Sequence, residues 1–270
     1  MSISPSLIWT GFGLTDIGRV RKMNQDTFSI RDDLQLWVLA DGMGGQAGGE
    51  IASQMAVDTI TQYFETPPPS FNTNNSLQCQ DEQHLLQALE FANQAIREKA
   101  EQNDAIRGMG TTVIAIRIIS GPSGNQAIVA HAGDSRLYLL RENRFTLWTR
   151  DHTLMEERLA LKLITPDQVR THPLRHVLTK GLGIEPIVQP TITRYPLEPQ
   201  DLLLLCSDGL TKMLTDQEIQ AAMLKIGIPS QRLCESLITN ANRLGGEDNT
   251  TVIVIGKERN RTEKTLHSSA

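Results

Sequence analysis

The segment LWVLADGMGGQAGGE, residues 36–50, runs from an apolar stretch through an aspartate into glycine-rich backbone. Its first residues are strand formers, and the apolar run 34–40 predicts a buried β-strand that Asp41 closes. Five of the eight residues 42–49 are glycine. Glycine tolerates sharp bends and lets other groups approach the main chain closely. We therefore expect a site where a carboxylate and an accessible backbone meet a ligand.

Composition limits the classes of protein that this chain can represent. The 270 residues are 39% hydrophobic and 21% charged, which is typical of one large globular domain or two small ones. With 26 basic and 31 acidic residues the net charge is −5, so no basic surface for nucleic acid or an anionic membrane is expected. No apolar run approaches the roughly 20 residues of a membrane span, and no signal sequence is evident, so we expect a cytosolic protein.

The cysteines indicate neither a disulfide framework nor a zinc site. Cys79, Cys206 and Cys234 are widely spaced and form no CxxC pair. Any metal site in this chain is therefore expected to use oxygen ligands.

Strand-like and helix-like segments alternate irregularly along the chain. Residues 126–143 look like a β-hairpin around the turn Gly133-Asp134-Ser135, so part of the sheet should be antiparallel. Helical periodicity marks 82–101 and 230–244, a T-x-x-E capping box starts a helix after Thr215, and another helix should start at Glu50 and end before Pro67. Residues 66–81 are expected to form a surface loop. The strand-like runs are 34–40, 110–119, 126–132, 136–143, 201–207 and 249–256.

Four aspartates stand at the ends of these strands, next to glycine or other turn residues: Asp41, Asp134, Asp208 and Asp248. Two unit charges about 4 Å apart repel by roughly 4 kcal/mol at an effective dielectric near 20, so a cluster of carboxylates needs a cation. Carboxylates and backbone carbonyls are suited to Mg²⁺ or Mn²⁺. Each aspartate alone is more typical of a turn or a helix cap than of a metal ligand, and it is the set of four that favours a metal site.

The order of motifs resembles the metal-dependent protein serine/threonine phosphatases of type 2C, in their short bacterial form. The resemblance implies two stacked antiparallel β-sheets flanked by helices, an αββα sandwich. It also implies a single catalytic domain over 1–257, a flap over about 150–185 and a polar tail over 258–270. The motifs that carry it are TDIGRVRKMNQD, ADGMGGQAGGE, GMGTTV, AGDSRLY, RDHTLMEE, HPLRHVLTKGLG, SDGL and EDNTTVIV.

Position by position, the resemblance implies a metal centre and a phosphate ligand. Two Mn²⁺ or Mg²⁺ ions are expected, with Asp41 bridging them and a third, weaker ion nearby. Arg21 is expected to grip the substrate phosphate, because a guanidinium matches two phosphate oxygens. The catalytic carboxylates are Asp41, Asp208 and Asp248. The metal ligands are Asp41, Asp208 and Asp248 at the first site, Asp26 and the carbonyl of Gly42 at the second, and Asp134 with Asp208 at the third.

The implied mechanism is direct attack on phosphorus by a water that lies between the two metal ions. No phosphoenzyme is expected, since no cysteine begins a C-x5-R motif and no D-x-D motif occurs. Relatives carry a histidine, a proposed proton donor to the leaving oxygen, where this chain has Met43 or Gln46. Neither side chain can act as a general acid.

These features predict a phosphoserine/phosphothreonine phosphatase that acts on phosphoproteins, as a monomer. Two alternatives stay open: a non-catalytic, metal-binding regulatory module of the same fold, and a phosphatase that acts mainly on small phosphoesters. His131 and His152 are expected to be structural. The basic flap residues that are candidates for contact with a protein substrate, and equally for a solvated face, are Arg158, Arg170, Arg175 and Lys180.

Overall fold

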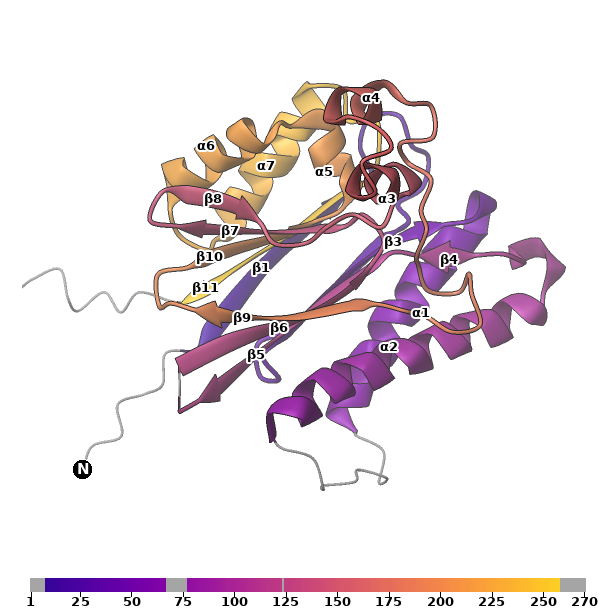
Figure 1. The fold of residues 1–270 in the computed structure, drawn as a ribbon, viewed down its shortest axis with the longest axis horizontal. Helices are drawn as coiled ribbons and strands as arrows, with labels where there is room; N and C mark the ends of the chain where they lie inside the picture. Colours follow the sequence, from indigo (N-terminus) through magenta and orange to yellow (C-terminus); the bar gives the residue numbers. More distant parts are fainter. Residues whose placement is uncertain (1–7, 67–76, 123, 258–270) are drawn as a thin grey trace, which may run out of the picture.

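The structure, a computed structural model, describes residues 8–66, 77–122 and 124–257. Over these ranges two β-sheets stack face to face, and helices cover the outer face of each sheet (Figure 1). The order of layers is helix, sheet, sheet, helix. This confirms the αββα sandwich that the resemblance implied.

Every strand pairing in both sheets is antiparallel. The first sheet has the order β1-β11-β10-β7-β8, and the second has the order β2-β3-β5-β6-β9 with the short β4 paired to the end of β3. In the first sheet the bounds are β1 (Trp9–Asp16), β7 (Arg136–Arg141), β8 (Arg144–Leu147), β10 (Leu202–Cys206) and β11 (Thr250–Lys257). In the second they are β2 (Asp26–Arg31), β3 (Leu36–Met43), β4 (Gly110–Thr111), β5 (Val113–Gly121), β6 (Gly124–Ala132) and β9 (Thr191–Leu197).

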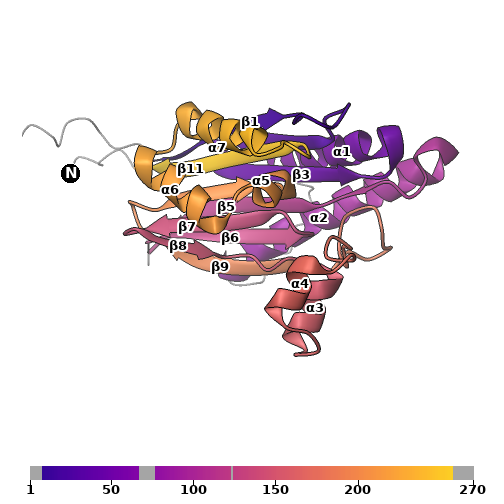
Figure 2. The same cartoon turned by 90° about the horizontal axis from the view of Figure 1, so that it is seen from above.

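The helices divide between the two outer layers and the segment between β8 and β9, whose helices project to one side of the sheets (Figure 2). None of the helices within the described ranges is long and apolar enough to cross a membrane. Helices α1 (Gly45–Glu65) and α2 (Leu77–Glu101) pack on the second sheet, followed by the 3-10 turn η1 (Asp104–Ile106). Helices α5 (Asp208–Met213), α6 (Asp216–Ile226) and α7 (Gln231–Arg243) pack on the first sheet, and α3 (Leu154–Ala160) and α4 (Pro166–Thr171) lie between β8 and β9.

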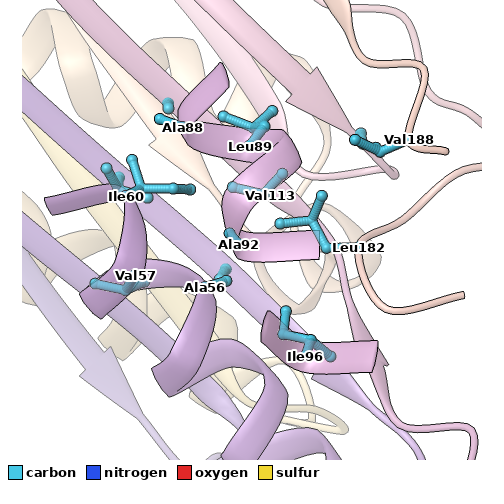
Figure 3. Packing of buried hydrophobic residues seen from close by; sticks show 14 of the residues in the cluster. Ala56, Val57, Ile60, Ala88, Leu89, Ala92, Ile96, Val113, Leu182 and Val188 are labelled. Atoms are coloured by element: carbon cyan, nitrogen blue, oxygen red, sulfur yellow. The ribbon is translucent and has the colours of Figure 1, made fainter. Parts of the chain in front are cut away.

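Burial on both faces explains why residues 36–40 are apolar without alternation. Trp37 and Leu39 lie in the core between the two sheets, whereas Leu36, Val38 and Ala40 face α1 and α2. Successive side chains of a strand point to opposite faces, so a strand of an inner layer needs apolar residues at every position. Figure 3 shows the helix-facing core, where side chains of α1 and α2 meet those of β5.

Several strands were not predicted, and β1 shows why. Its glycines weaken the strand signal, but they make room for aromatic side chains of the opposite sheet. A Cβ added at Gly11 would lie 2.2 Å from Trp37 Nε1, and one at Gly13 would lie 2.5 Å from Phe28 Cε2. The other strands without a prediction are β2, β8 and β9.

The predicted hairpin over 126–143 is wrong. Strand β6 belongs to the second sheet and β7 to the first, so the turn at Gly133-Asp134-Ser135 carries the chain from one sheet to the other. Turn residues indicate that the chain reverses its direction, but they do not determine which strands pair, because strand pairing depends on strands that are distant in the sequence. Here β7 pairs with β10 and β8, and β6 pairs with β5 and β9.

The helix boundaries also need correction. Helix α1 begins at Gly45 rather than at Glu50, and α2 begins at Leu77, so residues 77–81 are helical instead of looped. The rest of the predicted loop, 67–76, and the predicted tail, 258–270, lie outside the described residues. The capping box is confirmed: Thr215 Oγ1 accepts a hydrogen bond from Glu218 N, and Glu218 Oε2 accepts one from Thr215 N.

Candidate functional site

A cavity of about 730 Å³ opens where β3 and β10 end and the chain enters β11. Four of the predicted aspartates line it, together with Gly42 of β3 and Arg21 of the segment between β1 and β2. The aspartates are Asp41, Asp134, Asp208 and Asp248. The strand ends therefore meet at one end of the sandwich, and they come from two stacked sheets.

Asp26 completes the group from behind the cavity. It lies opposite Asp41 in the β2–β3 pairing and is only 7% exposed. Its Oδ2 accepts hydrogen bonds from Ser207 Oγ at 2.8 Å and from Thr251 Oγ1 at 2.7 Å. Because β2 belongs to one sheet, whereas Thr251 lies in β11 of the other and Ser207 directly follows β10 of that sheet, this carboxylate connects the two sheets beside the cavity.

The carboxylates repel one another strongly enough to change their ionisation. Burial, followed by repulsion from Asp26, Asp208 and the other two aspartates, raises the pKa of Asp41 well above its usual value. Burial and then Asp208 raise the pKa of Asp134 to about 7. Burial raises the pKa of Asp26 to about 6, although its two hydrogen bonds oppose this shift. The group is therefore short of positive charge.

Two cationic side chains contact the carboxylates nearest the cavity mouth. Lys212 Nζ lies 2.5 Å from Asp208 Oδ2 and 2.8 Å from Asp248 Oδ2. Arg21 contacts Asp248 with two nitrogens, Nε to Oδ1 at 2.8 Å and Nη2 to Oδ2 at 2.9 Å. Although burial opposes ionisation of Asp248, Lys212 and Arg21 hold its pKa below the usual value.

The donor set fits a hard divalent cation. Asp26 Oδ1 and Asp208 Oδ1 are buried and have no hydrogen-bond partner among the described residues, and a cation would satisfy both oxygens. Carboxylate and carbonyl oxygens are the ligands that Mn²⁺ and Mg²⁺ prefer. Within the described ranges no three Asp, Glu, His or Cys side chains already converge on one point as a metal site. The ammonium of Lys212 lies between Asp208 and Asp248 and pairs with both.

The glycines of the opening segment serve close packing of β3 against α1. A Cβ added at Gly42 would lie 2.0 Å from the carbonyl oxygen of Gly49, and one at Gly49 would lie 2.8 Å from the carbonyl of Gly42. Only glycine at both positions lets the end of β3 pass the first turns of α1 at this distance. Gly44, the residue before the helix, has a φ of +123°, a backbone conformation that residues other than glycine rarely adopt.

The two positions where the resemblance implied a proton-donating histidine hold Met43 and Gln46. Met43 lines the cavity, and the side chain of Gln46 lies outside the described part of the structure. His176, from the segment between α4 and β9, does line the cavity. Burial and the charges of Lys212 and Arg175 lower its pKa, which favours the neutral imidazole.

The two histidines expected to be structural are so. His131 is 4% exposed, and its Nε2 pairs with the carbonyl of Arg150 at 3.0 Å. His152 stacks on His131 with ring centroids 4.5 Å apart, and its Nδ1 accepts a hydrogen bond from Gly133 N. They hold the chain just before Asp134, which lies in the turn between the sheets, against the segment 150–152. None of the four basic flap residues named above is among the described side chains that line the cavity.

Sequence reasoning missed several residues that build the site. Lys212 had a usable signal, because it stands four residues after Asp208 and a helix that starts there brings the two side chains together. Asn249 had none: its Nδ2 donates to the carbonyls of Ile17 and Met23, and its Oδ1 accepts from Gln25 N. It thereby fixes the segment that carries Arg21. Ser207 and Thr251 also gave no signal.

Comparison with known proteins places this fold and site in one family. The family model for protein phosphatase 2C matches residues 18–242. Protein phosphatase PhpP of Streptococcus pneumoniae is 37% identical over 254 residues, which cover 93% of this chain and 98% of PhpP. The solved serine/threonine phosphatase of S. agalactiae matches with a TM-score of 0.81 and 33% identity, covering 93% of this chain and all of that one.

A structure with metal bound is similar as well. The catalytic domain of the serine/threonine protein phosphatase PstP, solved in complex with two manganese ions, matches with a TM-score of 0.76 and 33% identity. The match covers 93% of this chain and 99% of that domain. The chain therefore belongs to the protein phosphatase 2C family, whose members are serine/threonine phosphatases.

Proposed function

We propose that this protein is a metal-dependent phosphatase that hydrolyses phosphoserine and phosphothreonine in proteins and so opposes serine/threonine kinases in signalling. One observation carries the proposal: four aspartates line one cavity together with Arg21, and a fifth, Asp26, is close enough to Asp41 to raise its pKa. Such a concentration of like charge is costly unless cations are bound. Cations held there can in turn attract a phosphate.

The residues proposed to hold Mn²⁺ or Mg²⁺ are those that the sequence indicated. Asp41 would serve both principal ions, Asp208 and Asp248 the first, and Asp26 with the carbonyl of Gly42 the second. A third, weaker ion would use Asp134 and Asp208. Ions bound there supply Lewis acidity, which lowers the pKa of a water molecule and neutralises negative charge on the phosphate. The unpartnered oxygens of Asp26 and Asp208 support this assignment.

Arg21 is proposed to bind the substrate phosphate. Its side chain is 49% exposed and lies at the cavity, where its planar guanidinium already holds a carboxylate with two nitrogens. The same fork fits two phosphate oxygens. Binding substrate therefore requires Arg21 to exchange Asp248 for phosphate, and Asn249 keeps its chain segment in reach during the exchange.

The flap is proposed to shape the protein substrate's access. His176, Leu178 and Ile184 all line the cavity and all lie between α4 and β9. Leu178 is anchored by a β-bridge to Thr153, and Ile184 lies near Gly110 of β4. A peptide that presents its phosphate to the carboxylates would contact these residues.

No observation favours either alternative function. The regulatory module was suggested by Met43 and Gln46, but every carboxylate assigned to a metal is present in the sequence, and four of the five line the same cavity. The small-phosphoester phosphatase has no specific feature in its support. The cytosolic location, the monomeric state and the division into one catalytic domain and a tail stay predictions.

The test is turnover of a phosphothreonine peptide and of p-nitrophenyl phosphate, with Mn²⁺, with Mg²⁺ and with EDTA. We expect metal-dependent turnover of both by the wild type and its loss in Asp208→Asn, which keeps the side-chain volume and removes the charge. Asp216→Asn, at the start of α6, is the matched control and should retain activity. Turnover that persists in EDTA, or in Asp208→Asn, would contradict the proposal.

A further inference from the structure

Lys212 occupies an unusual place for a lysine in a site that is expected to bind divalent cations. Its ammonium lies between Asp208 and Asp248, at 2.5 Å and 2.8 Å from one oxygen of each. These are the two aspartates that the proposed function assigns to the first metal ion, so the inference rests on that function. The lysine side chain is 23% exposed, and the two carboxylates are 17% and 14% exposed.

The local fold explains how the ammonium reaches this position. Helix α5 begins at Asp208 and continues only to Met213, so Lys212 lies one turn after Asp208 on the same face. Asp248 enters from the segment before β11, and α5 packs against that strand, with a Cβ added at Gly209 lying only 1.9 Å from the carbonyl oxygen of Asn249. The short helix is thus held against the Asp248 segment, and Lys212 spans the gap between them.

The ammonium of Lys212 lies where a metal ion could lie and is also positively charged, but it binds the two carboxylates more weakly than a divalent ion would. A divalent ion coordinates carboxylate oxygens at about 2.0–2.6 Å, close to the spacing that the lysine already imposes on Asp208 and Asp248. It carries twice the charge and accepts further ligands, including the unpartnered Asp208 Oδ1. Both cannot occupy the same point, so entry of the ion requires the lysine to leave.

We propose that Lys212 is a displaceable counter-cation of the first metal site: it holds Asp208 and Asp248 together in the metal-free protein and is expelled into the cavity when a divalent ion binds. Two consequences follow from linkage. The lysine stabilises the metal-free protein, and it weakens metal binding by the same free energy, because that interaction has to be broken first. The partial exposure of its side chain gives it a path outward.

The first experiment compares Mn²⁺ binding by the wild type and by Lys212→Met in isothermal titration calorimetry on the full chain. Methionine keeps most of the aliphatic length and removes the charge. We expect Mn²⁺ to bind about tenfold more tightly to the variant, the size of one hydrogen bond to a charged group. In EDTA the variant should melt at a lower temperature than the wild type, and Mn²⁺ should raise its melting temperature by more. Lys225→Met, in the last turn of α6 and exposed, is the control and should change neither quantity.

The second measurement follows the lysine itself. The wild type is labelled briefly with an amine-reactive ester, with and without Mn²⁺, and digested for mass spectrometry. Labelling of Lys212 should rise several-fold when Mn²⁺ is present, while labelling of Lys225 in the same sample stays constant. This readout needs no variant, so a folding defect of Lys212→Met would not obscure it.

The outcomes separate this inference from the proposed function. Mn²⁺ affinity that is equal or weaker in Lys212→Met, or labelling of Lys212 that does not respond to Mn²⁺, overturns the inference and leaves phosphatase activity untouched. Tighter Mn²⁺ binding by the variant, in a protein whose wild type turns over no phosphoester, supports the inference and overturns the proposed function.

Discussion

The hydrogen bonds that connect the two sheets at Asp26 lead to a quantitative prediction for Ser207→Ala. Ser207 is fully buried at the end of β10. Its Oγ donates to Asp26 Oδ2 at 2.8 Å and accepts from Thr251 N at 3.0 Å. Alanine fits the space but removes both interactions.

The expected cost follows from these two losses. A hydrogen bond to a charged group contributes roughly 1.5–3 kcal/mol, and a buried amide left without a partner costs roughly 1–3 kcal/mol. We expect Ser207→Ala to lower the free energy of unfolding by about 4 kcal/mol. For a domain of this size, that corresponds to a fall of about 8–16 °C in melting temperature. Because the pKa of Asp26 is about 6, the loss should be larger at pH 8, where Asp26 is ionised, than at pH 5.

Urea denaturation in EDTA at both pH values measures the effect. Ser120→Ala is the matched control, because Ser120 Oγ bonds to Asn125 Oδ1 at 2.8 Å on the exposed end of β5. This substitution should lower the free energy of unfolding by less than about 0.5 kcal/mol. A loss below about 1 kcal/mol for Ser207→Ala at pH 8, or the same loss at pH 5, would refute the reasoning that Asp26 is held as a buried carboxylate by these donors.

Three further predictions concern ionisation, phosphate binding and packing. The folded-state pKa values of Asp26 and Asp134 are raised to about 6 and about 7, so the metal-free protein should lose stability as pH rises from 4 to 7. In urea titrations with EDTA, Asp134→Asn should flatten this pH dependence. An unchanged slope would count against the repulsion between the carboxylates. Arg21→Lys should raise KM for a phosphothreonine peptide about tenfold, because lysine cannot contact two phosphate oxygens with two nitrogens. Steady-state kinetics that show an unaltered KM would exclude Arg21 as the phosphate ligand. Gly42→Ala should lower the free energy of unfolding by more than about 2 kcal/mol in thermal denaturation, since the added Cβ would collide with backbone. Gly121→Ala should be tolerated, because a Cβ added there has no neighbouring atom nearer than 3.9 Å. Equal stability of the two variants would contradict the close-packing argument.

The sequence alone was sufficient for the chemistry and the layer structure. Local patterns sufficed for the apolar run before Asp41 and for the capping box at Thr215, because both depend on residues close together in the chain. The aspartates were recognisable because each stands beside turn residues at a strand end, and the order of motifs gave the family. The six strand runs were all found as strands, apart from small differences at their ends and an interruption at Thr112.

Only the tertiary structure decided which strands pair and what neutralises the carboxylates. Strands β6 and β7 are apolar on both faces, so nothing local distinguishes a hairpin from a crossing between sheets. Gly45, Gly48 and Gly49 precede the predicted helix start at Glu50, yet they form the first turn of α1, because the cost of glycine in helix propensity is offset by the contact of Gly49 with the backbone of Gly42, which only glycine allows. Asp26 depends on Ser207 and Thr251, far away in sequence. Lys212 lies near Asp208 in sequence, but its second partner, Asp248, is brought to it only by folding. Contacts between distant residues follow from the packing of the whole chain, so they leave no local pattern in the sequence.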